Sequence, residues 1–132
     1  MKNIDFDLVV QNGLMNSSAD GYHMFFDKDL ACFVVSENDE PPVWCADHDV
    51  VMCPYAVAPK AAVWKRFYEI ISDDERAQID SFEGNMSFFD FMRETGIICT
   101  YREAERLVIE DIFKAWVVMH GITIDWNNIV VR

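Results

Sequence analysis

The side chains best suited to bind a metal ion lie in one short stretch, where Cys45, His48 and Cys53 follow a Cys-x2-His-x4-Cys spacing. A structural zinc site needs four nitrogen or sulfur ligands, usually supplied as two closely spaced pairs. The second pair is missing here, and Cys32, the available fourth ligand, lies in a pattern typical of a buried strand. We therefore predict no metal and no cofactor, and we keep a small Cys/His metal-binding protein as an alternative.

Nucleophilic and acid–base chemistry are also poorly supported. A reactive cysteine needs a lowered thiol pKa, whereas Asp47 and Asp49 beside these thiols act to raise it. Cys99 precedes a predicted helix and is better placed, but a buried core cysteine is the simpler interpretation. The carboxylates of residues 73–75 are explained by helix capping. Because the sequence also lacks the common phosphate-loop, serine-hydrolase and zinc-peptidase motifs, we predict no catalytic residues and no enzymatic activity.

Charge is the strongest functional signal in the sequence. The 132 residues include 23 acidic and 11 basic side chains, a net charge of −12, where a magnitude of about 2 to 8 suffices to keep a small domain soluble. Residues 1–50 hold ten acids and two bases, a net of −8, and residues 51–132 hold thirteen acids and nine bases, a net of −4. Such a field attracts cationic surfaces and repels nucleic acids and anionic membranes. We therefore expect a basic protein partner, such as a nuclease or another nucleic-acid-binding protein, with no direct contact to nucleic acid or membrane.

An acidic, proline-containing loop marks where such a partner is expected to bind. Trp44 follows the run Asp39-Glu40-Pro41-Pro42-Val43, and a tryptophan in a stiff loop, surrounded by charge, is typical of an interface anchor. The alternative is that Trp44 folds back over a sheet edge. The predicted contact residues are Asp27, Asp29, Glu37, Asp39, Glu40, Trp44, Asp47 and Asp49.

These residues must be positioned by a mixture of strands and helices. Periodicity and capping signals predict a helix over 4–13 capped by Asn3, a β-hairpin over 21–36, a third strand over 50–52, helices over 59–71, 72–82, 86–95 and 101–120, and short closing strands over 122–124 and 129–131. Capping boxes at Ser72–Glu75 and Thr100–Glu103 place two of the helix starts. The expected fold is a single α+β domain over 1–132, with the N-terminal helix and small antiparallel sheet packed with about four C-terminal helices. Because no apolar run is long enough for a membrane helix and the N-terminus lacks a leader pattern, we expect a cytoplasmic protein with reduced cysteines.

The order of these elements resembles a family of small, acidic, uncharacterised bacterial proteins. The segments that carry the resemblance are Tyr22-His23-Met24-Phe25-Phe26-Asp27, residues 67–75, Ser87-Phe88-Phe89-Asp90-Phe91 through Gly96-Ile97, and Tyr101-Arg102-Glu103 with Trp116 and Gly121-Ile122. This chain lacks the glycine that the family carries in its hairpin turn, and it has Asp90 where the family has basic residues. The resemblance implies an α+β fold and no established activity.

Together these observations predict a non-enzymatic binding or inhibitor protein that neutralises a basic, nucleic-acid-handling partner, of the immunity, anti-defence or DNA-mimic type. A housekeeping bacterial domain without mimicry is the main alternative, and it predicts that the charge is dispersed over the surface. The second alternative is the Cys/His metal-binding protein built on Cys45, His48 and Cys53.

Overall fold

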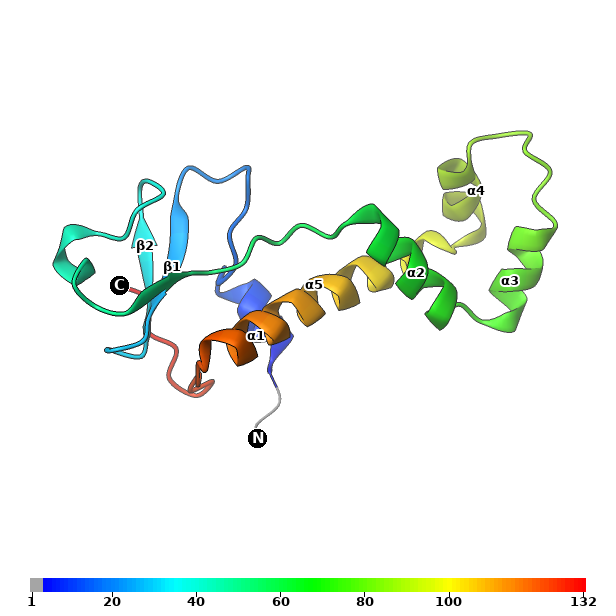
Figure 1. The fold of residues 1–132 in the computed structure, drawn as a ribbon. Helices are drawn as coiled ribbons and strands as arrows, with labels where there is room; N and C mark the ends of the chain where they lie inside the picture. The colour runs from blue at the N-terminus through cyan, green and yellow to red at the C-terminus, as the bar shows by residue number, and fades with distance from the viewer. Residues whose placement is uncertain (1–3) are drawn as a thin grey trace. The chain divides into compact units, whose positions relative to one another are not determined.

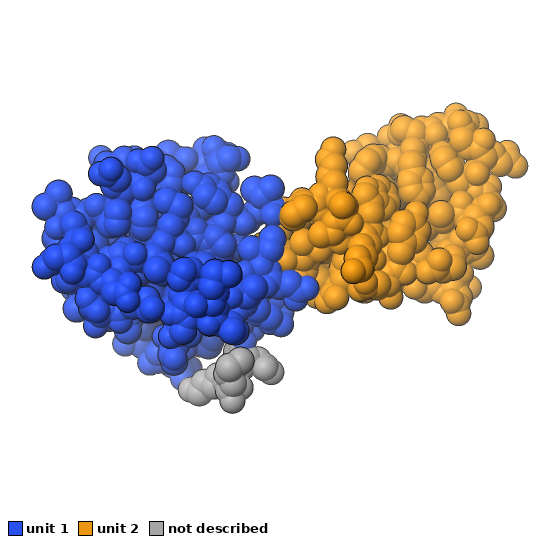
Figure 2. All heavy atoms as spheres, viewed as in Figure 1, with its two compact units in different colours: residues 1–57, 110–132 blue, residues 58–109 orange. Residues whose placement is uncertain are grey.

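The computed structural model describes residues 4–132 and confirms the α+β class. The chain forms two compact units, shown in blue and orange in Figure 2. Unit 1 comprises residues 1–57 and 110–132, and unit 2 comprises residues 58–109. Each unit is described by itself below.

Unit 1 is built on a small antiparallel sheet. Its elements, before the chain enters unit 2, are α1 (Phe6–Gln11), β1 (His23–Asp27), β2 (Cys32–Ser36), the 3-10 turn η1 (Val43–Cys45) and β3 (Val50–Met52) (Figure 1). The strand order is β2-β1-β3, with β1 antiparallel to both neighbours. The predicted hairpin and third strand are therefore confirmed. Helix α1 is shorter than predicted and begins after Asp5, whose carboxylate accepts from the backbone N–H of Leu8; the predicted cap Asn3 lies outside the described residues.

Both faces of β1 are buried, as its two-sided apolar pattern predicts. On one face Phe25 packs with Val34 of β2 and with Cys45 of η1. On the other face the ring of Phe26 meets Trp116 of helix α5 (Ile98–His120), with ring centroids 6.5 Å apart. The indole N–H of Trp116 also donates to the carbonyl of Met52, so α5 is tied to β3. The loop that contains η1 thus covers one face of the sheet.

The turn between β1 and β2 determines where the site residues lie. The register pairs Asp27 with Cys32, which leaves residues 28–31 as a four-residue connection. Ala31 closes this turn in the left-handed conformation, with φ of 52°. A glycine adopts that conformation at no steric cost, whereas an alanine is strained in it.

The chain's last residues lie along the outer edge of β2. Phe33 forms a parallel bridge with Val131, and the N–H of Val35 donates to the carbonyl of Arg132. The predicted strand over 129–131 is therefore reduced to a bridge. The predicted strand over 122–124 is wrong, because these residues form no ladder in the structure; a short apolar run has no strand identity without a partner to pair with.

Unit 2 is helical. It contains α2 (Lys60–Ile70), α3 (Asp73–Asp80), α4 (Phe88–Thr95) and the first part of α5. Its core is aromatic: Trp64 lies against Phe67, Phe88 and Tyr101, with ring centroids 5.0 to 5.9 Å apart. Within residues 4–132 no helix has both the length and the apolarity required to cross a bilayer.

The helix boundaries in unit 2 confirm one predicted capping box and correct the other. At the start of α3, Ser72 and Glu75 form the full reciprocal box. Thr100 instead lies inside α5, which begins at Ile98, directly after the turn at Gly96. The Thr100 hydroxyl donates to the Glu75 carboxylate at 2.5 Å, so it serves a tertiary contact and does not cap a helix.

Candidate functional site

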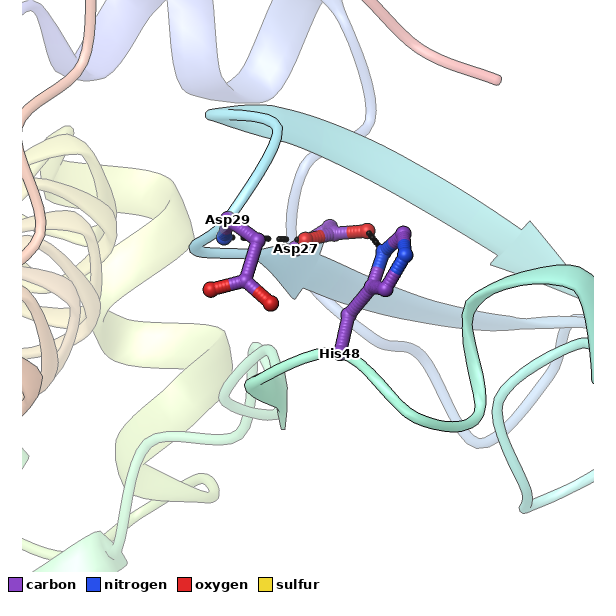
Figure 3. Close-up of side chains that lie close together, drawn as sticks. All are labelled: Asp27, Asp29 and His48. Atoms are coloured by element: carbon purple, nitrogen blue, oxygen red, sulfur yellow. Dashed lines mark hydrogen bonds and ion pairs between the residues drawn. The ribbon is translucent and has the colours of Figure 1, made fainter.

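The carboxylate of Asp27 is the centre of the candidate site. Its side chain is fully buried, at the last position of β1. One oxygen, Oδ1, accepts from the backbone N–H groups of Asp29 and Leu30 at 3.0 and 3.1 Å. The other, Oδ2, lies 2.6 Å from Nδ1 of His48, as Figure 3 shows. The turn thus orients the carboxylate toward a residue 21 positions later in the chain.

His48 is held in place by the segment that leads into β3. The N–H of Lys28 donates to the carbonyl of Asp49, and the N–H of Asp49 donates to Oδ2 of Asp29. The Lys28 ammonium also lies 3.5 Å from the Asp49 carboxylate. The hairpin turn and this segment are therefore joined by backbone and side-chain bonds, which bring one carboxylate oxygen each of Asp27 and Asp29 and one ring nitrogen of His48 within 4.8 Å of one another.

Both members of the Asp27–His48 pair are shifted toward their charged forms. The hydrogen bond to Asp27 raises the pKa of His48, and the charges of Asp27, Asp47 and Asp29 add to it against the effect of burial. Burial raises the pKa of Asp27, but the hydrogen bonds from His48 and from the Leu30 N–H outweigh it, so that this pKa is lowered overall. A buried carboxylate requires a partner of this kind to remain ionised.

Exposed apolar side chains adjoin the pair. The ring of Trp44 lies edge-on to the His48 ring, with centroids 6.3 Å apart. Trp44 is 47% exposed and its neighbour Val43 is 92% exposed. Asp47 places Oδ1 3.8 Å from Nε2 of His48 and is otherwise open to solvent. Trp44 therefore contacts the site and keeps half of its surface available to a partner.

The predicted contact residues fall into three environments. Asp27 has no exposed surface, so it positions its neighbours and offers nothing to a partner directly. The hairpin-end acids, Asp29, Asp47 and Asp49, are exposed around His48, whose ring contacts Trp44. The strand-end acids, Glu37, Asp39 and Glu40, are exposed where the chain leaves the opposite end of β2. A five-residue strand spans about 16 Å, and the segment that carries Val43 and Trp44 links the two groups in sequence.

The structure does not bring the cysteines of the metal-binding alternative together with His48 into one ligand group. Cys45 and Cys53 are buried, and within residues 4–132 the only group of three potential metal ligands comprises Asp27, Asp29 and His48. Burial and the charge of Asp27 raise the pKa of Cys45, and burial raises the pKa of Cys53. A raised thiol pKa makes both cysteines poor nucleophiles.

Two further placements depart from the sequence interpretation. Cys99 is exposed in the first turn of α5 and is not a core residue. Asn16, which falls between the predicted helix over 4–13 and the predicted hairpin over 21–36, is buried and joins two segments of unit 1 through its side-chain amide. An isolated asparagine among Ser and Gly is typical of a turn, so no sequence signal distinguishes it from its exposed neighbours.

Comparisons of this chain with family models, curated proteins and solved structures found no match.

Proposed function

We propose that the protein binds a basic, nucleic-acid-handling protein through an acidic face formed by the hairpin-end acids together with Val43 and Trp44. The observation that carries the proposal is the half-exposed Trp44 against His48, a histidine that itself lies next to the exposed carboxylates of Asp29 and Asp47. An apolar anchor surrounded by charge of one sign is the arrangement expected of an interface whose partner is cationic. The proposal makes the protein an inhibitor or immunity-type binder without catalysis.

The distribution of charge between the two units supports this choice of face. Unit 1 contains 13 acidic and 4 basic residues, a net of −9, and unit 2 contains 10 acidic and 7 basic residues, a net of −3. In unit 2 several arginines pair with acids one helical turn away, namely Arg66–Glu69, Arg93–Asp90, Arg102–Glu105 and Arg106–Glu103. The housekeeping alternative expects such dispersed, paired charge everywhere, and unit 1 departs from it.

The strand-end acids extend the negative surface. Within residues 4–132 none of Glu37, Asp39 and Glu40 forms an ion pair. The backbone of their loop is nevertheless ordered by Ser36, whose hydroxyl donates to the carbonyl of Glu40 at 2.6 Å, and by Asn38, which accepts from the N–H of Glu40. Fixed, unpaired carboxylates raise the rate of encounter with a positive surface.

The test compares three variants that remove the same number of charges. The first carries Asp29→Asn, Asp47→Asn and Asp49→Asn, the second carries Glu37→Gln, Asp39→Asn and Glu40→Gln, and the control carries Asp73→Asn, Asp74→Asn and Glu83→Gln in unit 2. Each variant and the wild type capture proteins from host lysate at low salt in the presence of a chelator. A protein that is captured by the wild type and the control but lost by the hairpin-end variant is identified, purified and titrated.

We expect the purified partner to bind with an affinity that falls about tenfold or more between about 50 and 300 mM salt. Trp44→Ala should weaken it about thirtyfold, because a central aromatic anchor contributes about 2 kcal/mol. Equal losses in the hairpin-end and control variants would mean that net charge alone drives capture. That result, or binding that does not respond to salt, contradicts the proposal.

A further inference from the structure

The cluster of Asp27, Asp29 and His48 brings together the donor atoms of a metal site. One carboxylate oxygen from each aspartate and one ring nitrogen of His48 all lie within 4.8 Å of one another (Figure 3). The three side chains come from the hairpin turn and from the segment before β3, which are joined by backbone hydrogen bonds. The donors are therefore gathered before any ligand arrives, which reduces the entropic cost of binding one.

The electrostatics of the cluster favour a cation with two positive charges. Asp27 is wholly buried, and the exposed carboxylates of Asp29 and Asp47 lie close by. The neighbouring lysine, Lys28, is directed to Asp49. A protonated His48 supplies only one positive charge to the cluster of Asp27, Asp29 and Asp47. A divalent ion at the centre balances both aspartates, which a single imidazolium does not.

We propose that Asp27, Asp29 and His48 form a three-ligand site for a divalent transition metal ion, with zinc as the best match. A mixed set of imidazole nitrogen and carboxylate oxygens suits zinc better than calcium or magnesium, which prefer oxygen alone. Three protein ligands leave a fourth tetrahedral position for water. This site is independent of the proposed function, since it requires no partner protein.

The geometry requires only a small rearrangement. Ligands about 2.0 Å from a tetrahedral zinc ion are about 3.3 Å apart, whereas Nδ1 of His48 and Oδ2 of Asp27 are separated by 2.6 Å. The pair must therefore open by less than about 1 Å, and the Asp29 oxygen, which lies within 4.8 Å of the other two donor atoms, must approach them by at most about 1.5 Å. The proton between these two atoms departs to solvent or moves to Nε2 when the ion takes its place.

Asp47 occupies the position expected of a supporting carboxylate. Its Oδ1 lies 3.8 Å from Nε2, the ring nitrogen that the metal does not use. Histidine ligands usually donate this second N–H to a carboxylate, which fixes the ring tautomer and orientation. A carboxylate thus lies on each side of the imidazole, Asp27 at Nδ1 and Asp47 near Nε2.

The test titrates the full chain with zinc alone, by calorimetry, and with cobalt, by absorption spectroscopy. All proteins carry Cys99→Ser, because Cys99 is an exposed thiol with its own affinity for zinc. We expect saturable micromolar binding of one zinc ion, a cobalt spectrum without a thiolate charge-transfer band, and a shift of the Nδ1 resonance of His48 in nitrogen NMR.

Three variants separate this site from general attraction of cations to an acidic protein. Asp29→Asn and His48→Gln should each weaken zinc binding about tenfold or more, and Asp47→Asn should weaken it less, as a supporting residue does. The control Asp73→Asn with Asp74→Asn removes two exposed carboxylates elsewhere and should leave the affinity unchanged. Circular dichroism and thermal melting verify that each variant is folded; Asp29→Asn keeps an oxygen that accepts from the Asp49 N–H and is the safer of the two.

Failure of the inference is distinct from failure of the proposed function. Absence of saturable zinc binding in the micromolar range, or equal binding by wild type and both ligand variants, overturns the metal site. Capture of a basic partner in chelator is unaffected by either result. If the wild type binds zinc but captures no basic partner, the proposed function alone is overturned.

Discussion

Asn16 shows how much a single side chain contributes to the frame that carries the site. Its amide N–H groups donate to the carbonyls of Met24 and Cys53, and its Oδ1 accepts from the Met24 N–H. Its backbone pairs with the segment after β3 as well. One buried residue therefore joins the start of β1 to the end of β3.

Replacing Asn16 with alanine should lower the free energy of unfolding by about 2 to 4 kcal/mol, because the buried carbonyls and N–H that it serves lose their partners. Urea denaturation measures the change. The adjacent Ser17→Ala serves as control, since it removes only an exposed contact with the Ala19 N–H and should cost less than about 0.5 kcal/mol. Similar losses in the two variants would contradict the role given to the Asn16 amide.

The sequence predicts the residues of the site better than their arrangement. Asp29, Asp47 and Asp49 are exposed around His48, and Trp44 contacts the same ring. The burial of Asp27 is not predictable locally, because the side chain shares a sheet face with Phe25 and that face is covered by a loop from later in the chain. The same long-range packing groups His48 with aspartates instead of cysteines.

At the scale of elements, local signals succeed where the neighbours in sequence are also the neighbours in space. The bounds of β3 and the capping box of α3 follow from a few adjacent residues. The start of α5 does not, because the Thr100 hydroxyl is used by Glu75, 25 positions earlier. A Ser or Thr followed by Glu three residues later is a capping signal only when no tertiary partner competes for the hydroxyl.

The contact between Thr100 and Glu75 makes the stability of unit 2 depend on pH. Burial raises the pKa of Glu75, but hydrogen bonds from Thr100 and Ser72 outweigh it and lower this pKa below its ordinary value of 4.5. A lowered carboxyl pKa stabilises the fold above the unfolded value, and the stabilisation is lost as pH falls through the folded value.

Thr100→Val should therefore cost about 1 kcal/mol near neutral pH, and the difference from wild type should shrink at an acidic pH well below 4.5, as the Glu75 carboxylate takes up a proton. Denaturant titrations of both proteins at the two pH values check this. A difference that is constant with pH would assign the loss to packing of the new methyl group and not to the carboxylate.

The junction between α4 and α5 depends on the backbone freedom of Gly96. This residue has φ of 80° and terminates α4. Gly96→Ala should lower the free energy of unfolding by about 1 kcal/mol, because alanine is strained in the left-handed region. The control Gly21→Ala also adds a methyl group into open space but at a residue without positive φ, and chemical denaturation should place it within about 0.5 kcal/mol of wild type.

For the whole molecule, the sequence predicts the fold class and the direction of the charge asymmetry. Residues 1–50 carry a net charge of −8, and unit 1, which contains them together with residues 51–57 and 110–132, carries −9. The sequence does not show that residues 110–132 return to that unit, nor that the arginines of residues 58–109 are largely used in helical ion pairs. Pairing depends on which helix face each charge occupies, and this is settled only when the helix boundaries are known.

The last residues of the chain have a protective consequence through their position on β2. Phe33 donates to Val130 and accepts from Arg132, so the outward backbone groups of this strand are already satisfied. A strand that keeps such groups open is a template for adding strands from other molecules. Removing residues 130–132 would leave these backbone groups without partners, and we expect the shortened chain to self-associate through the outer edge of β2.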